Sequence, residues 1–296
     1  MNKLIAFCLF SLLALAPVYA EAKPLSVVTT FSILGDFVKQ VGGDDIDLKI
    51  LVGPDADAHA YTPTPEDSKA LAHADLFIQN GLGFEGWVSR LAYASGYKGP
   101  VVTVGESLAA PAKSEDKITD DPHAWQNVSN ARLYVKTIAA ALGKAMPEKA
   151  SEFNARATAY DAKLEELDAW VKSEIGWVSA PKRKIITNHD AFGYFGAAYG
   201  ITFISPQGVS TEVEPTAWRV AKLVEQIKAE KIKRVFIENM ANPKLMTQLA
   251  KDAGASLGKP VYSDSLSGAN GPAPDFISMI RYNVVQFTQA MMLNGE

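Results

Sequence analysis

The chain has 296 residues, of which 48% are hydrophobic and 21% are charged. This composition excludes a disordered, collagen-like or disulfide-scaffold protein, and a single cysteine makes no bridge. The 29 basic and 33 acidic residues give a net charge of −4, so no positive field is available to hold nucleic acid or an anionic membrane surface. We therefore expect no nucleic-acid partner.

Residues 1–20 have the three parts of a secretory signal peptide. Lys3 is followed by an apolar run to Ala16 and by a small-x-small pattern that ends at Ala20. A membrane anchor is the alternative interpretation, but the run is shorter than the roughly 20 apolar residues of a membrane-spanning helix. Cys8 lies inside the run rather than at its end, which argues against a lipoprotein. We predict cleavage after Ala20, which removes the cysteine and leaves a periplasmic protein.

The first half of the mature chain alternates short apolar or β-branched runs with helical stretches. This pattern is typical of a parallel sheet covered by helices. The expected strands are residues 25–31, 45–52, 74–79 and 101–104. We assign residues 21–146 to an N-terminal lobe that would bind a ligand together with a second lobe.

Residues 147–178 have the pattern of one long helix. Pro147 suits the first turn, and Gly176 with Pro181 marks the end. At 1.5 Å per residue such a helix is about 42 Å long. We interpret it as a spine that links two lobes, and a long surface helix of one domain is the alternative. Its apolar face consists of Phe153, Tyr160, Leu164, Leu167, Val171 and Ile175.

The alternation returns in residues 179–296, which we assign to a C-terminal lobe. The expected strands are residues 184–188, 201–204, 234–238 and 260–263, with helices over residues 218–229 and 244–253. The predicted fold is therefore α/β, with two lobes, each a mostly parallel sheet flanked by helices.

Three of the four histidines, and one aspartate, fall where such a fold gathers ligands. His59 follows the strand at residues 45–52, and His189 and Asp264 come directly after strands of the second half. His123 lies in a loop before a helix that Ser129 is expected to cap. Three imidazoles and one carboxylate suit zinc or another first-row ion.

Each histidine taken alone has a simpler interpretation, as a solvated loop residue or a hydrogen-bonded packing residue. The sequence has no HExxH motif and no close histidine pair that would select a metal site by spacing. His73 lies near the end of a helix that begins at about Thr64, where a cationic side chain suits the helix dipole, so we interpret it as structural.

A family resemblance extends this pattern. The segments GPDADAHAYTPTPED, DPHAW, TNHDAFGYFGAAYGI, VFIENMANPKLM and YSDSLSG resemble, in this order, the signatures of the cluster A-I, or TroA-like, solute-binding proteins of metal-ion ABC transporters. The resemblance runs from about Ser26 to about Met291. It implies two α/β lobes joined by a long helix, with a metal ion held between them. The implied ligands are His59, His123, His189 and Asp264.

The resemblance also implies partners and a mechanism. The protein would capture its ion and deliver it to an inner-membrane ABC permease with a cytoplasmic ATPase, which lowers the affinity by separating the lobes. A metallochaperone is a further candidate partner, and we expect a monomer. Because imidazoles must be neutral to bind, we expect release of the ion below about pH 6.

Two features of the chain bear on the metal. His189 occupies a position where zinc-binding relatives typically have His and manganese-selective relatives have Glu, and imidazole favours zinc. Residues 105–122 lack the His-rich loop of many zinc-specific relatives. We expect Zn²⁺ as cargo, with Mn²⁺ or Fe²⁺ as the alternative. A third feature, Gln126-Asn127-Val128 where relatives commonly have Leu-Asp-Pro, concerns the start of a helix.

Other classes of protein fit less well. An exported zinc hydrolase would keep an open metal position for water, whereas four protein ligands fill a tetrahedron, so we expect no enzyme. A siderophore or corrinoid binder would need clusters of Arg, Trp or Tyr in a wide cleft. Tyr61, Asn188 and Glu238 lie near the candidate ligands and are candidates to contact them, with ordinary loop polarity as the alternative.

Overall fold

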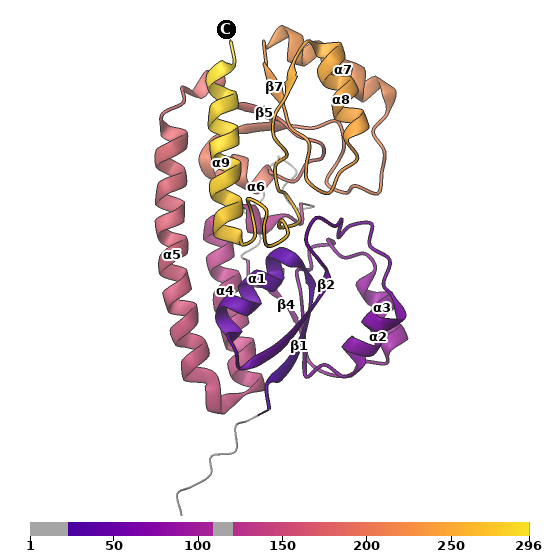
Figure 1. Ribbon diagram of the computed structural model, residues 1–296, viewed down its shortest axis with the longest axis vertical. Helices are drawn as coiled ribbons and strands as arrows, with labels where there is room; N and C mark the ends of the chain where they lie inside the picture. The colour runs from indigo at the N-terminus through magenta and orange to yellow at the C-terminus, as the bar shows by residue number, and fades with distance from the viewer. Residues whose placement is uncertain (1–22, 109–120, 296) are drawn as a thin grey trace, which may run out of the picture.

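The computed structural model describes residues 23–108 and 121–295. Two four-stranded parallel sheets lie in two lobes (Figure 1). Their orders, β2-β1-β3-β4 and β6-β5-β7-β8, give both lobes the same topology. The strands are β1 (Leu25–Phe31), β2 (Ile46–Val52), β3 (Leu76–Gln79), β4 (Val101–Thr103), β5 (Lys184–Ile186), β6 (Thr202–Ile204), β7 (Arg234–Val235) and β8 (Ser256–Leu257).

Helices cover both faces of each sheet, as the alternating sequence pattern predicts. In Figure 1, α1 and α4 lie on the opposite side of the first sheet from α2 and α3, and α9 lies on the opposite side of the second lobe from α7 and α8. The α-helices are α1 (Ser32–Gly42), α2 (Pro65–Ala72), α3 (Val88–Ser95), α4 (Val128–Ala145), α5 (Ala150–Gly176), α6 (Gly193–Tyr199), α7 (Ala217–Ala229), α8 (Pro243–Ala253) and α9 (Phe276–Leu293).

The strand predicted at residues 260–263 is wrong. This segment forms only an isolated bridge between Val261 and Glu238, and the fourth strand of the second sheet is β8. The Asn283 side chain bonds both the backbone N–H of Tyr262, at 3.0 Å, and its carbonyl, at 2.6 Å. Val261 makes two backbone hydrogen bonds, with Ile237 and Asn239, but pairing is confined to this one residue, so an extended strand does not form there.

The long helix α5 lies within the predicted linking segment. A 3-10 turn at Pro147–Lys149 precedes it, and it ends at Gly176. All six residues of the predicted apolar face are buried. Figure 1 shows α5 running beside both lobes, with α4 and α9 next to it.

The larger of two clusters of buried apolar residues crosses from one lobe to the other. It contains residues of β1, α1, α4 and α5 together with residues of α6 and α9. At the crossing, the ring centroids of Phe37 in α1 and Phe276 in α9 are 4.8 Å apart. The smaller cluster packs the strands of the second sheet against α7 and α8. Packed side chains therefore join the lobes near α5.

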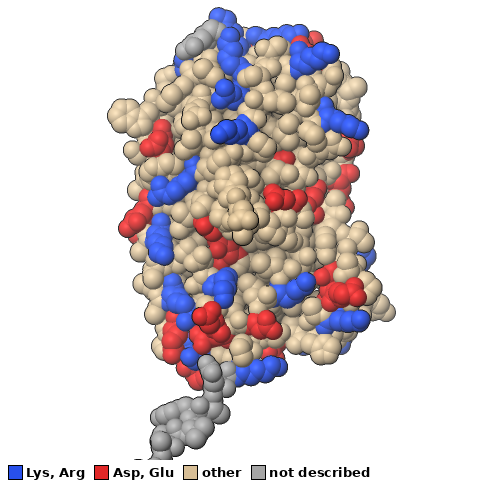
Figure 2. Space-filling view, viewed as in Figure 1, with Lys and Arg blue, Asp and Glu red and all other residues tan. Residues whose placement is uncertain are grey.

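Residues 1–22 and 109–120 are outside the described part of the chain, so the predicted signal peptide and its cleavage site have no structural counterpart here. Among the described residues, no helix has both the length and the apolar character to cross a bilayer. On the face in Figure 2, basic and acidic side chains are interspersed around a large uncharged area.

Candidate metal centre

Four buried side chains from separate segments meet between the lobes. Each offers one nitrogen or oxygen, and these atoms all lie within 4.8 Å of one another. We call this set the His/Asp cluster: His59, His123, His189 and Asp264. All four predicted site residues are thus brought together. His73 lies apart, at the C-terminal cap of α2, where its Nδ1 is 2.7 Å from the carbonyl oxygen of Lys69.

The distances within the His/Asp cluster match those around a small ion. Nε2 of His123 is 3.2 Å from Nε2 of His59 and 3.3 Å from Nε2 of His189. Asp264 Oδ2 is 3.1 Å from Nε2 of His189 and 3.4 Å from Nε2 of His59. Its Oδ1 is 3.5 Å from Nε2 of His123. Zinc bonds of about 2.05 Å in a tetrahedron place ligand atoms about 3.3 Å apart, so the cluster suits such an ion.

Asp264 is the only carboxylate within the cluster. It is fully buried, and neither of its oxygens has a hydrogen-bond partner among the described residues. Burial opposes its ionisation, but the charges of His123 and His189 outweigh this and hold the pKa of Asp264 well below its usual value. A buried, ionised carboxylate needs positive charge beside it, which protonated His123 and His189 supply here and which a bound cation would supply in their place.

A second carboxylate, Asp121, orients His123. Its Oδ1 accepts a hydrogen bond from the backbone N–H of His123 at 2.9 Å and lies 2.7 Å from Nδ1 of that ring. Nε2 is therefore left to face the cluster, as in metal-binding histidines held by a carboxylate. Asp121 is not among the residues predicted from the sequence. The signal was an acidic residue two positions before the histidine of DPHAW.

A third carboxylate, Glu238, plays the same part for His189. Its Oε1 accepts from the backbone N–H of His189 at 2.9 Å, and its Oε2 lies 2.5 Å from Nδ1 of the ring and accepts from Ser263 Oγ at 2.6 Å. Asn188 Oδ1 accepts from the backbone N–H of Glu238 at 2.8 Å. Two of the three predicted neighbours, Glu238 and Asn188, thus belong to the hydrogen-bonded surroundings of His189. The third, Tyr61, donates its hydroxyl to Asp67 instead.

These carboxylates change the pKa values of the two histidines that they face. Burial alone lowers the pKa of His123, but the charge of Asp264 and the hydrogen bond with Asp121 outweigh it and raise the pKa to about 9. Burial opposes the charged form of His189 as well, and the charges of Glu238 and Asp264 raise its pKa well above the usual value. Without an ion, these carboxylates therefore favour the doubly protonated, positively charged form of both rings.

His59 has a different environment. Its ring packs on Phe84, with the centroids 4.6 Å apart, and the carbonyl before it, of Ala58, accepts a hydrogen bond from Trp87 Nε1 at 2.8 Å. It is 5% exposed, whereas the other three members of the cluster are at 0%. His59 therefore lies on the solvent side of the cluster.

The segments of His123 and Asp264 are joined across the lobes. Trp125 Nε1 and Gln126 Nε2, in the turn after His123, both donate to the carbonyl of Ser263, at 3.0 and 2.6 Å. Gln126 belongs to the segment that departs from the family pattern. Its neighbour Asn127 caps α4 by accepting from the N–H of Ser129 at 2.9 Å, so the prediction that Ser129 is the cap is wrong.

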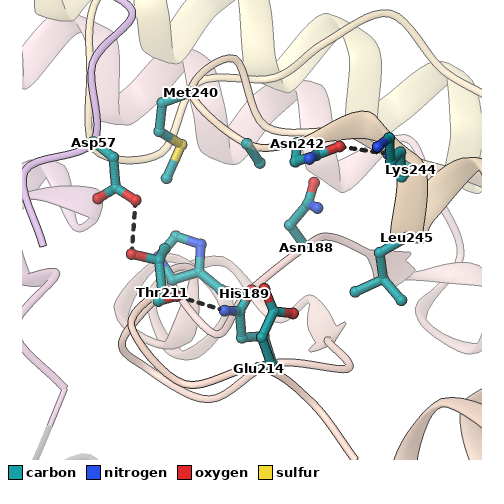
Figure 3. A pocket seen from close by; sticks show the side chains of 11 residues that line it. Asp57, Asn188, His189, Thr211, Glu214, Met240, Asn242, Lys244 and Leu245 are labelled. Carbon is teal, nitrogen blue, oxygen red and sulfur yellow. Dashed lines mark hydrogen bonds between the residues drawn. The ribbon is translucent and has the colours of Figure 1, made fainter. Parts of the chain in front are cut away.

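A cavity of about 290 Å³ reaches His189 from outside the cluster (Figure 3). Asp57, from the first lobe, and Thr211, from the second, face each other across it. Glu214, Asn242 and Lys244 also line it. Of the cluster, only His189 lines this cavity.

Comparison with known proteins gives a consistent family. Residues 27–290 match the family described as zinc-uptake complex component A, periplasmic. The chain is 31% identical over 272 residues to the manganese-binding lipoprotein MntA of Halalkalibacterium halodurans, covering 92% of this chain and 90% of that protein. It is 33% identical over 264 residues to the iron-binding protein YfeA of Yersinia pestis, covering 89% of this chain and 85% of that protein.

A solved structure agrees with these relatives. The periplasmic zinc-binding protein TroA of Treponema pallidum superposes with a TM-score of 0.86 at 33% identity, covering 91% of this chain and 99% of that chain. The fold class and the resemblance predicted from the sequence are thereby confirmed. The chain belongs to the ZnuA/TroA family of metal-binding proteins, the substrate-binding components of metal-ion ABC transporters.

Proposed function

We propose that the protein binds one Zn²⁺ ion in the His/Asp cluster and delivers it to an ABC permease. Family membership supports metal capture for a transporter, and it makes the protein a solute-binding protein and not an enzyme. The observation that carries the assignment of the ligands is the spacing of the ligand atoms, 3.1 to 3.5 Å for the five pairs measured above. The four residues would then be the metal ligands.

The donor set supports zinc as the cargo. The relatives named above bind manganese, iron or zinc, so their names favour no single metal. Three imidazoles and one carboxylate favour zinc over manganese, which prefers oxygen ligands. The carboxylates of Asp121 and Glu238 make the imidazoles more basic and therefore better ligands. Mn²⁺ or Fe²⁺ is the alternative cargo.

Delivery requires that affinity be lost at the transporter. In this proposal, docking on the permease moves the lobes apart, which takes His59 and His123 away from His189 and Asp264. The ion then has too few ligands to stay bound. A metallochaperone that supplies the ion is a further candidate partner in this proposal.

Metal analysis of variants tests the assignment. Protein purified without chelator should contain one equivalent of metal, and His59→Ala and Asp264→Ala should lose it. His73→Ala is the matched control, because it removes a histidine outside the cluster and should retain full metal content. Retention of metal by both cluster variants would contradict the proposed ligands. Competition titrations of the metal-free protein that show tighter binding of Mn²⁺ than of Zn²⁺ would contradict the proposed cargo.

Family membership places the protein outside the cytoplasm. We propose further that export removes residues 1–20, so that the mature chain begins at Glu21. Its parts would be an N-terminal lobe (21–146), a linking helix (147–178) and a C-terminal lobe (179–296). N-terminal sequencing of the exported protein tests the cleavage site, and light scattering tests the proposal that the mature protein is a monomer.

A further inference from the structure

One hydrogen bond between the lobes crosses the cavity beside the His/Asp cluster. Thr211 Oγ1 donates to Asp57 Oδ2 at 2.7 Å, and both residues line the cavity that reaches His189 (Figure 3). Asp57 follows β2 in the first lobe, and Thr211 lies between β6 and α7 in the second. This bond therefore joins the two lobes at the cavity that His189 also lines.

Asp57 is also attached to one of the proposed ligands. Its Oδ1 accepts hydrogen bonds from the backbone N–H groups of His59, at 2.9 Å, and Ala60, at 3.4 Å. The two oxygens of one carboxylate thus bind the His59 backbone and the opposite lobe. A displacement of Thr211 removes one of the contacts that hold this carboxylate in place.

The other end of the bond is attached to the His189 segment. Residues 205–216 are held to that segment by backbone hydrogen bonds from Gln207 N–H to the Asn188 carbonyl, at 3.3 Å, and from Asp190 N–H to the Gly208 carbonyl, at 3.1 Å. The Asp57–Thr211 bond therefore couples the segments that carry His59 and His189.

The other side of the cluster is fastened more extensively. Residues 263–268 of the second lobe receive hydrogen bonds from Trp125 and Gln126, and Leu266 bonds both Ser32 Oγ and the Asp55 backbone, each at 2.9 Å. By contrast, within the described part of the chain, the bond to Asp57 is the one hydrogen bond from residues 205–216 to the first lobe. Separation of residues 205–216 from the first lobe therefore breaks fewer hydrogen bonds than separation of residues 263–268.

We propose that the Asp57–Thr211 hydrogen bond is a latch on the path of the ion, and that it sets the rate at which the bound ion dissociates. This inference rests on the proposed function, because it requires that the His/Asp cluster bind a metal ion. Thr211 is a positioning residue. It acts on His59 through Asp57. Rupture of the Asp57–Thr211 hydrogen bond opens the cavity, while the His123 and Asp264 segments stay joined.

Dissociation kinetics of zinc test the latch. Full-length mature protein loaded with one equivalent of Zn²⁺ is mixed with an excess of a chromogenic chelator, and the release rate is recorded by stopped flow. Thr211→Val keeps the branched shape but removes the donor, so release should accelerate about tenfold, the loss expected for a hydrogen bond to a charged group. Thr211→Ser keeps the hydroxyl and should release zinc within about twofold of the wild-type rate.

A second interlobe bond supplies the matched control. Asn239 Nδ2 donates to Asp55 Oδ1 at 2.9 Å, and Asn239 does not line the cavity. Asn239→Ala should therefore leave the release rate within about twofold of wild type. Thr211→Ala provides the same test as Thr211→Val if the valine variant does not fold.

Three results would overturn the latch. The first is a wild-type release rate in folded, zinc-loaded Thr211→Val. The second is an equal acceleration in Asn239→Ala, which would indicate a general loosening of the lobes. The third is a wild-type protein that binds no zinc or other divalent metal, which would overturn the proposed function as well. The first two results leave the proposed function intact, so the two failures are distinguishable.

Discussion

Nδ1 of His123 lies 2.7 Å from Oδ1 of Asp121, and the other oxygen of this carboxylate lies so close to α6 of the opposite lobe that a Cβ atom at Gly193 would be 2.6 Å from it. One side chain thus orients a histidine of the first lobe and fits against the second. Its position depends on a residue without a side chain at the start of α6.

Asp121→Ala should weaken zinc binding by about 10- to 100-fold, because the His123 ring loses both its orienting contact and a nearby negative charge. Asp121→Asn should weaken it less, since the amide oxygen still accepts a hydrogen bond from Nδ1. Affinities measured by chelator competition check this order. The control is Asp44→Asn, at a fully exposed carboxylate. Equal affinities for Asp121→Ala and wild type would show that Asp121 does not position the ring.

Gly193→Ala should reduce zinc affinity by roughly tenfold, because the added methyl group displaces Asp121 from His123. Alanine is the better helix former, so the loss would not come from a weaker α6. Gly86→Ala is the matched control, since a Cβ at Gly86 meets no atom within 4 Å. The same affinity for both glycine variants would contradict the steric argument.

Zinc affinity should fall as the pH is lowered. The ion binds neutral imidazoles, and the pKa of His123 is raised to about 9 while that of His189 is raised well above its usual value, so binding displaces protons. Below about pH 9 each displaced proton costs a factor of about ten in affinity per pH unit. The expected pH dependence therefore begins well above the pH 6 that ordinary imidazoles suggest. Titrations that give one affinity at about pH 8 and about pH 6 would contradict this.

The stability of the metal-free protein should depend on pH in the opposite direction to zinc affinity, and should fall as the pH rises. A histidine whose pKa is raised on folding stabilises the fold most at pH values below its unfolded pKa of about 6.5, and this contribution is lost as the pH rises through the folded pKa. For His123 the loss occurs between about 6.5 and about 9. Urea unfolding of the chelator-treated protein across this range measures it. A free energy of unfolding that rises over the same interval would contradict the assignment.

Removal of the metal should lower the melting temperature. Free zinc at 100 times its dissociation constant stabilises the folded state by about 2.7 kcal/mol, which corresponds to about 5–10 °C for a chain of this size. Differential scanning calorimetry with and without chelator measures the shift. His59→Ala should show little zinc-dependent shift, and a full shift in that variant would place the stabilising ion elsewhere.

Much of the fold could be predicted because strongly apolar strands are recognisable in the sequence. The strand β1 has the predicted bounds, residues 25–31, and six of its seven residues are buried. β8 could not be predicted, because Ser256 and Leu257 are two exposed residues at the edge of the sheet with no apolar run. The run at residues 260–263 suggested a strand, yet only Val261 pairs with the neighbouring segment, in an isolated bridge to Glu238, and the backbone of Tyr262 bonds the Asn283 side chain instead of a strand.

The clustering of the four candidate residues was predictable for a different reason. Ligands bind at the carboxyl ends of strands in α/β sheets, and the family motifs identify which residues there are candidate metal ligands. The sequence therefore indicated the same four residues, His59, His123, His189 and Asp264. Asp121 was not named, because the local sequence does not show that its carboxylate faces Nδ1 of His123, or that it packs against Gly193, about 70 residues away in the sequence. The Asp57–Thr211 bond joins residues that are likewise distant in the chain, and no local sequence pattern predicts it.

The central claim is that the His/Asp cluster holds one zinc ion between the lobes. Anomalous diffraction at the zinc edge, from crystals of protein loaded with one equivalent of Zn²⁺, tests it most directly. One anomalous peak is expected within about 2.0–2.2 Å of the three Nε2 atoms and of an oxygen of Asp264. A fully occupied zinc peak at any other place in the protein, with none at the cluster, would contradict it.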